Sequence, residues 1–139
     1  MAFEDLKEGF IVEKEKYEEN FLGPHITKIK NYCVVYKDGN VSYKDIKLTV
    51  SEKIRVALVA RFLANKLEPS IANEMSVDEL FTSIGTIDKG SNSLNVRLSN
   101  EVTHGYITRT KRKMYMVPPY KIPKILSELP LKEQDKKQR

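Results

Sequence analysis

A chain of 139 residues can bury one ordinary hydrophobic core, and its 40% hydrophobic and 31% charged residues are typical of a soluble globular protein. No apolar run approaches the roughly 20 residues that span a bilayer. The acidic N-terminal residues lack the pattern of a signal peptide, so we expect a cytoplasmic protein without a membrane segment. A single cysteine excludes an internal disulfide and a cysteine-based zinc cluster. No catalytic pair, phosphate-binding loop or metal-ligand cluster is recognisable, which predicts a non-enzymatic protein without metal or cofactor.

The net charge of +5 is concentrated towards the C-terminus. Residues 106–139 hold 10 Lys/Arg against 3 Asp/Glu, whereas residues 1–105 hold 14 against 16. A cationic segment beside a helix face without acidic residues is the pattern expected of a nucleic-acid binder. The plainer interpretation is a lysine-rich tail that only keeps the protein soluble. It accounts for residues 132–139 better than for the cationic stretch that precedes them.

The first 25 residues are acidic and ambiguous. Five aromatic or aliphatic residues fall close to a helical seam, namely Phe3, Leu6, Phe10, Tyr17 and Phe21. Gly9 weakens a continuous helix, and residues 10–12 could equally form a short strand. We favour a short helix followed by extended chain, and we expect Gly23-Pro24 to end whatever precedes it.

Residues 26–48 predict a β-hairpin. Its arms run from about Lys28 to Tyr36 and from Val41 to Leu48, and both are rich in Val, Ile and Tyr. The Asp38-Gly39 pair between them supplies the positive φ of a tight turn. Around Tyr32 to Tyr36 both faces are apolar, which predicts a strand covered on two sides. Cys33 lies in this arm and is expected to be a buried small hydrophobe.

The sequence from Thr49 to Glu52 is a capping box that predicts a helix from about Val50 to Lys66. Its wide apolar face makes it the expected scaffold helix of the fold. Glu68-Pro69 ends it, and residues 70–75 could add a short strand to a later hairpin.

A second capping box, from Ser76 to Glu79, predicts a short helix that ends at Gly85. Met75 and Leu80 flank this box at the spacing of a hydrophobic staple. The box therefore marks the start of a helix that is followed closely by another one.

The next helix is expected from about residue 91 to His104, before Gly105. At 100° per residue, Leu94, Leu98 and Val102 share one narrow arc and should face the core. The opposite face carries no Asp or Glu and consists of Asn92, Ser93, Val96, Ser99, Asn100 and Thr103.

Beyond Gly105 the pattern changes to alternation. Residues 106–109 and 114–117 predict two short strands joined by a basic tip at residues 110–113. Ile122, Ile125, Leu126 and Leu129 then follow helical spacing, and residues 131–139 are expected to be disordered.

Residues 50–129 resemble the winged helix-turn-helix superfamily of archaeal and bacterial DNA-binding proteins. The resemblance is carried by Ser76-Val77-Asp78-Glu79-Leu80, by the run from Asn92 to Val102, and by Gly105-Tyr106-Ile107. It implies an α+β fold, with a three-helix core, a β-hairpin wing and a closing helix. The expected organisation is an N-terminal extension with a β-hairpin over residues 1–48, the winged domain over 49–130, and a basic tail over 131–139.

The resemblance also implies two sets of site residues on double-stranded DNA. The helix before Gly105 would read bases in the major groove through Asn92, Ser93, Val96, Arg97 and Asn100. The wing would contact the DNA backbone through Arg109, Lys111, Arg112 and Lys113.

Two functions remain open from the sequence. The first is a DNA-binding transcription regulator or DNA-transaction factor, which could act as a homodimer through residues 3–48. The second is a winged helix used for protein docking in a replication, transcription or repair assembly. Docking is favoured by the acidic N-terminus, by the apolar hairpin and by the presence of only one cation, Arg97, on the helix face. The cationic tip favours DNA binding.

Overall fold

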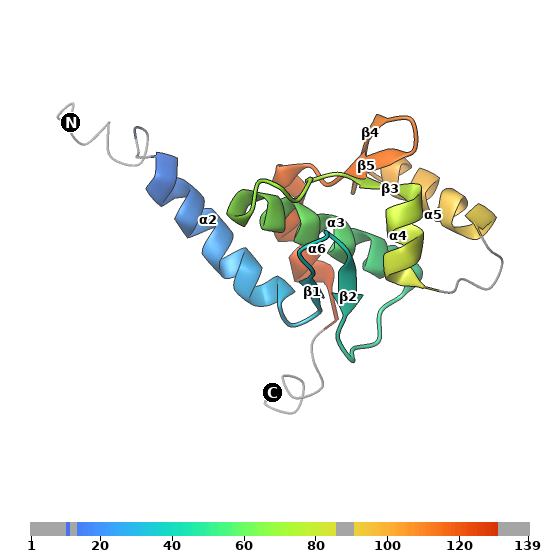
Figure 1. Ribbon diagram of the computed structural model, residues 1–139, viewed down its shortest axis with the longest axis horizontal. Coiled ribbons are helices and arrows are strands. Elements are labelled where there is room, and N and C mark those ends of the chain that lie inside the picture. The colour runs from blue at the N-terminus through green and yellow to red at the C-terminus, as the bar shows by residue number, and fades with distance from the viewer. Residues whose placement is uncertain (1–10, 12–13, 86–90, 131–139) are drawn as a thin grey trace.

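Helices form the centre of this α+β molecule, and two small antiparallel sheets lie on opposite sides of them (Figure 1). The computed structural model describes residue 11 and residues 14–85 and 91–130, except for the side chains of residues 14–19 and 91–93. Among the described helices, none combines the length and the hydropathy that crossing a bilayer requires.

Helix α3 (Val50–Leu67) is the scaffold, as the sequence predicts. Both halves of its capping box are present, because Thr49 accepts from the Glu52 amide and Glu52 accepts from the Thr49 amide. Every residue from Val56 to Leu63 is buried. A helix that is covered on nearly all sides must be packed by several neighbours, and α3 contacts α2, α4, α5 and both sheets.

Helix α2 (Lys14–Ile29) corrects the prediction that Gly23-Pro24 ends the first helix. Pro24 lies inside α2, where it removes one backbone hydrogen bond. The turns after it bring Ile26 and Ile29 onto the core, against α3 and α6. Because tertiary packing supplies most of the stability of such helices, this burial outweighs the local penalty of the proline.

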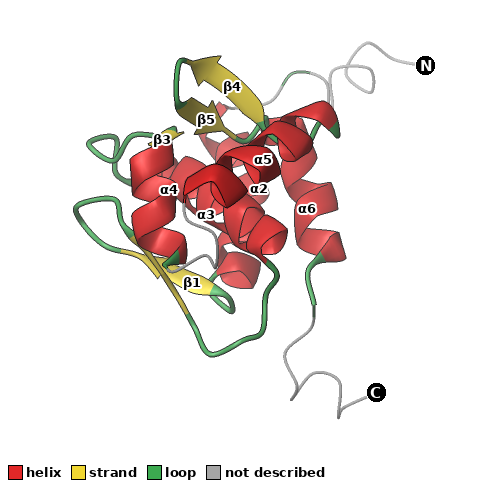
Figure 2. Cartoon of the chain, turned by 90° about the vertical axis from the view of Figure 1, so that its right-hand side faces the viewer, coloured by secondary structure: helices red, strands yellow, loops and turns green. Residues whose placement is uncertain are grey.

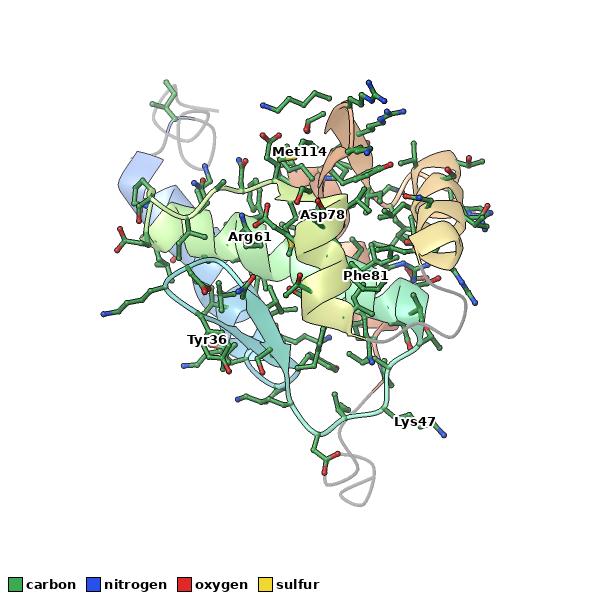
Figure 3. All side chains as sticks on the ribbon, turned by 45° about the vertical axis from the view of Figure 1, so that its right-hand side comes forward. Tyr36, Lys47, Arg61, Asp78, Phe81 and Met114 are labelled. Carbon is green, nitrogen blue, oxygen red and sulfur yellow. The ribbon has the colours of Figure 1, made fainter. Side chains whose placement is uncertain are left out.

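The N-terminal hairpin is present but shorter than predicted, because the first residues expected in it belong to α2 and its second strand ends at Tyr43 instead of Leu48. Strands β1 (Cys33–Val35) and β2 (Val41–Tyr43) pair antiparallel around a turn in which Gly39 has φ +94°. The hairpin packs on α3 and α4 by one face only. Val34 is 43% and Tyr36 54% exposed, so the expected cover on both sides is wrong. Figure 3 shows Tyr36 on the outer side of this hairpin.

The second capping box starts α4 (Val77–Ile84), which ends at Gly85 with φ +85°. Just before it, β3 (Met75–Ser76) pairs antiparallel with β5 (Met114–Met116), so the short strand that the sequence left possible is present. Helix α5 (Ser91–Thr103) follows and packs on α3 and α4.

The second hairpin consists of β4 (Thr108–Lys111) and β5 (Met114–Met116), and with β3 it forms a sheet of order β3-β5-β4. A 3-10 turn (Pro119–Lys121) then leads into α6 (Ile122–Glu128), which buries Ile122, Ile125 and Leu126. The prediction for residues 131–139 lies outside the described residues.

Candidate nucleic-acid interface

Helix α5 presents an exposed polar face. Val96 is 59% exposed, and Arg97 and Asn100 are also exposed. Their neighbours Asn95, Ser99 and Thr103 are exposed as well, and the whole set contains no acidic residue. Two further predicted base-reading residues, Asn92 and Ser93, lie in the first turn, where side chains are outside the described part.

The buried side of α5 differs from the prediction at one position. Leu94 and Leu98 are fully buried, but Val102 is 37% exposed and Glu101 is buried in its place. Glu101 accepts two hydrogen bonds from Arg55 of α3, at 2.6 Å from Nε and 2.9 Å from Nη2. A bidentate guanidinium–carboxylate pair compensates for the burial of the charge. The partner is 46 positions away in the chain, so helical spacing alone could not identify it.

The same arginine connects the end of α5 to the start of the hairpin. The Arg55 guanidinium lies 3.8 Å from the ring centroid of Tyr106, a cation–π contact. The Tyr106 hydroxyl donates towards Glu128 of α6 at 3.1 Å. The hydrogen bond and the charge of Glu101 raise the pKa of Arg55, although burial lowers it. Helices α3, α5 and α6 are thus joined at the root of the β4–β5 hairpin.

The β4–β5 hairpin carries the four predicted backbone-contact residues, with Arg109 and Lys111 in β4 and Arg112 and Lys113 in the turn. Arg109, Lys111, Arg112 and Lys113 are all exposed. Lys113 adopts a positive φ of 61° at the turn, which is uncommon for a residue with a side chain. The register shifts between Arg109 and Lys111, which leaves Thr110 without a partner across the strand. A bulge of this kind twists a strand and redirects its side chains.

The exposed face of α5 and the cationic hairpin are close neighbours. Only residues 104–107 separate α5 from β4. Figures 1 and 2 agree that both elements lie at the same end of the molecule, and in Figure 2 α5 faces the viewer below the hairpin. Helix α2 and the β1–β2 sheet pack on other helices, so the N-terminal elements described do not cover the α5 face.

Two residues that anchor this region, Glu74 and Arg61, are not identified by the sequence patterns. Glu74 directly precedes β3. Its carboxylate accepts a hydrogen bond from the Thr110 hydroxyl at 2.6 Å and lies 3.5 Å from the Lys111 ammonium group. Arg61 of α3 is only 3% exposed, and it donates to four groups in three separate segments. Figure 3 shows Arg61 on the side of α3 towards α4. An arginine inside an apolar helix face is a weak signal that could have pointed to such a hub.

A second feature lies away from this interface. A groove of about 300 Å³ runs between the end of α2, strand β1 and the end of α3. Its walls are apolar, and the exposed residues Val34 and Leu67 belong to them. Lys30 and Glu68 are its charged residues, and both are exposed.

Within residues 20–85 and 94–130, whose side chains the structure describes, no group of three His, Cys, Asp or Glu side chains is arranged to hold a metal ion. Cys33 is buried, as predicted, and burial raises the pKa of its thiol to about 12. His104 is exposed, and its Nδ1 lies 2.8 Å from the carbonyl oxygen of Asn100 at the end of α5. Cys33 is thus explained by core packing, and His104 by its contact with the end of α5.

No protein-family model, curated protein or solved structure matches the chain.

Proposed function

We propose that residues 49–130 form a winged helix-turn-helix and that the protein binds double-stranded DNA without acting as an enzyme. In this proposal α4 and α5 are the helix pair, β4–β5 is the wing and α6 closes the domain. A transcription regulator or another DNA-transaction factor is the role that fits. The observation that carries the proposal is the position of the acid-free face of α5 beside four exposed cations of the hairpin.

The two surfaces have different tasks in this proposal. Arg97 and Asn100 provide the donors and acceptors that pair with guanine and adenine edges, and Val96 fits a thymine methyl group. Asn92 and Ser93 complete the base-reading set at the start of α5. The hairpin cations neutralise phosphates and fix the orientation of α5 on the duplex.

The first experiment measures duplex DNA affinity by fluorescence anisotropy at several salt concentrations. The test variant is Lys111→Ala/Arg112→Ala/Lys113→Ala. The control is Lys37→Ala/Lys44→Ala/Lys47→Ala, which removes the same charge from exposed positions on the β1–β2 side; Figure 3 places Lys47 away from Met114 in β5. Each lost phosphate contact should reduce the salt slope by about 0.9, so the wing variant should lose about 2.7 and the control little.

A wild type without measurable DNA binding, or equal losses in both triple variants, would overturn the proposal.

The second experiment tests base reading by selection of binding sites from a random duplex pool. Arg97→Ala and Asn100→Ala should each weaken binding to the selected site by about 1–3 kcal/mol and relax specificity at one position. Retention of the wild-type site preference by both variants would remove α5 as the reading helix.

A second candidate function, protein docking, is favoured by the apolar groove, and we propose a second copy of this chain as its occupant. Lys30 and Glu68 place opposite charges on the groove. A two-fold axis can bring Lys30 of one copy against Glu68 of the other, and such self-complementary pairing is what a symmetric dimer uses. A dimer would also present two copies of α5 to DNA.

Sedimentation equilibrium over a range of protein concentrations tests this dimer. Leu67→Glu should shift the equilibrium to monomer, since Leu67 is 66% exposed and can change without loss of core packing. Lys30→Glu and Glu68→Lys should each weaken the dimer, and the double reversal should restore it. A wild type that is monomeric at high micromolar concentration would refute the dimer and leave the DNA proposal standing.

A further inference from the structure

An acidic side chain, Glu74, lies beside one of the cations of the β4–β5 hairpin, Lys111. Glu74 Oε2 accepts a hydrogen bond of 2.6 Å from the Thr110 hydroxyl, and Glu74 Oε1 lies 3.5 Å from Lys111 Nζ. The hydrogen bond from Thr110 and the charge of Lys111 lower the pKa of Glu74, although desolvation raises it. The carboxylate is therefore ionised at neutral pH and lies beside the Lys111 ammonium group.

Three contacts hold this carboxylate in position. The Glu74 carbonyl oxygen accepts from Arg61 at 3.0 Å, and the next residue, Met75, pairs with Tyr115 of β5. On the hairpin side, the irregular register leaves Thr110 outside the strand pairing, and its hydroxyl bonds Glu74. The Glu74 side chain is 24% exposed, whereas that of Lys111 is 69% exposed. The acid is held by its neighbours, whereas most of the lysine side chain is in solvent.

We propose that Glu74 is an internal competitor for DNA phosphate: it holds Lys111 in the free protein and so limits the affinity of the hairpin for DNA. This inference rests on the proposed DNA binding and adds its regulation. When a phosphate takes Lys111, the hydrogen bond from Thr110 keeps the carboxylate in place beside the hairpin. The protein then binds less tightly and with a smaller salt dependence than the four exposed cations alone would give.

The expected size follows from the exposure of the pair. An exposed ion pair contributes about 0.2–1 kcal/mol, so release of Lys111 by Glu74→Gln should tighten DNA binding by roughly 1.4-fold to fivefold. The salt slope should steepen by up to about 0.9, the value of one additional phosphate contact. Glutamine has nearly the same shape and can still accept from Thr110, so the fold of the hairpin is preserved.

The experiment is a double-mutant cycle on the full chain, with duplex DNA affinity measured at two salt concentrations for the wild type, Glu74→Gln, Lys111→Met and the double variant. Asp45→Asn is the matched control, because Asp45 is exposed on the loop after β2 and its change adds the same charge. Thermal unfolding confirms that each variant is folded. We expect Glu74→Gln to tighten binding in the wild-type background only, and Asp45→Asn to change affinity less than Glu74→Gln does.

The outcomes separate this inference from the proposed function. If the wild type binds DNA but Glu74→Gln leaves the affinity and the salt slope unchanged, the competitor role is refuted and DNA binding stands. If Glu74→Gln tightens binding equally with and without Lys111, its effect is general repulsion and the inference also fails. If neither the wild type nor any variant binds DNA, the proposed function itself falls.

Discussion

Replacement of Arg61 is the sharpest test of how the fold is held together. Its Nε donates to the Ala72 carbonyl at 2.8 Å, Nη1 to the Gly39 carbonyl at 3.0 Å and to Glu79 at 2.7 Å, and Nη2 to the Glu74 carbonyl at 3.0 Å. These groups belong to the β1–β2 turn, to the segment before β3, and to α4. One side chain therefore joins three segments to α3.

Arg61→Met fills most of the same volume but leaves three carbonyl oxygens and one carboxylate without their donor. Removal of one partner from a buried charged network costs about 3–5 kcal/mol. Glu79 has 36% side-chain exposure and regains water, so most of the cost comes from the carbonyl groups. We expect a loss of about 3–5 kcal/mol in the free energy of unfolding, a large share of the 5–15 kcal/mol typical of a domain.

Urea unfolding followed by circular dichroism measures this loss. With a slope of about 1–3 kcal/mol per M, the midpoint should fall by roughly 2 M. Arg61→Lys keeps the charge but not the forked geometry, and should lose about 1.5–3 kcal/mol, so it reports the effect if Arg61→Met does not fold. Glu79→Gln is the control, because it leaves the backbone bonds of Arg61 intact. A loss below about 1 kcal/mol for Arg61→Met would refute the reasoning, since it would mean that water or rearrangement satisfies the carbonyl groups freely.

Three further predictions concern single groups. Burial raises the pKa of Glu79, but hydrogen bonds from Arg61 and Ser76 outweigh it and hold the pKa below the ordinary 4.5. The ionised Glu79 therefore stabilises the fold fully above its unfolded pKa, and this stabilisation is lost as the pH falls through its folded pKa. In urea titrations, the difference in free energy of unfolding between wild type and Glu79→Gln should shrink from about pH 6 to about pH 3. A difference that stays constant over this range would contradict the prediction. Burial raises the pKa of Cys33 to about 12, so Ellman's reagent should label it rapidly only after unfolding, and fast labelling of the native protein would show that the thiol is accessible. Gly39→Ala should destabilise by about 1–2 kcal/mol, because φ is +94° and an added Cβ would lie 3.2 Å from the Arg61 guanidinium carbon. The control is Gly23→Ala, whose added Cβ meets no atom within 4 Å and lies inside helix α2. It should stabilise the protein by about 0.5–1 kcal/mol in thermal melts. A Gly39→Ala variant more stable than Gly23→Ala would refute both predictions.

Local hydrogen bonding could be predicted from the chain itself. The capping boxes at Thr49 and Ser76 and the positive φ at Gly39 were all predictable, and the structure confirms them. Each depends on groups within a few residues of one another. Their geometry therefore does not depend on a distant segment of the chain. The exposure of Arg97 and Asn100 follows in the same way from helical spacing.

Only the tertiary structure decided which local preferences would give way. Helix α2 continues through Pro24 because Ile29 is buried against other helices. Glu101 displaces Val102 from the core because Arg55 is placed opposite it. Glu74 meets Thr110 across 36 positions of the chain. Such partners are chosen by packing between distant segments, whose energies are comparable to the local ones and leave no periodic trace in the sequence.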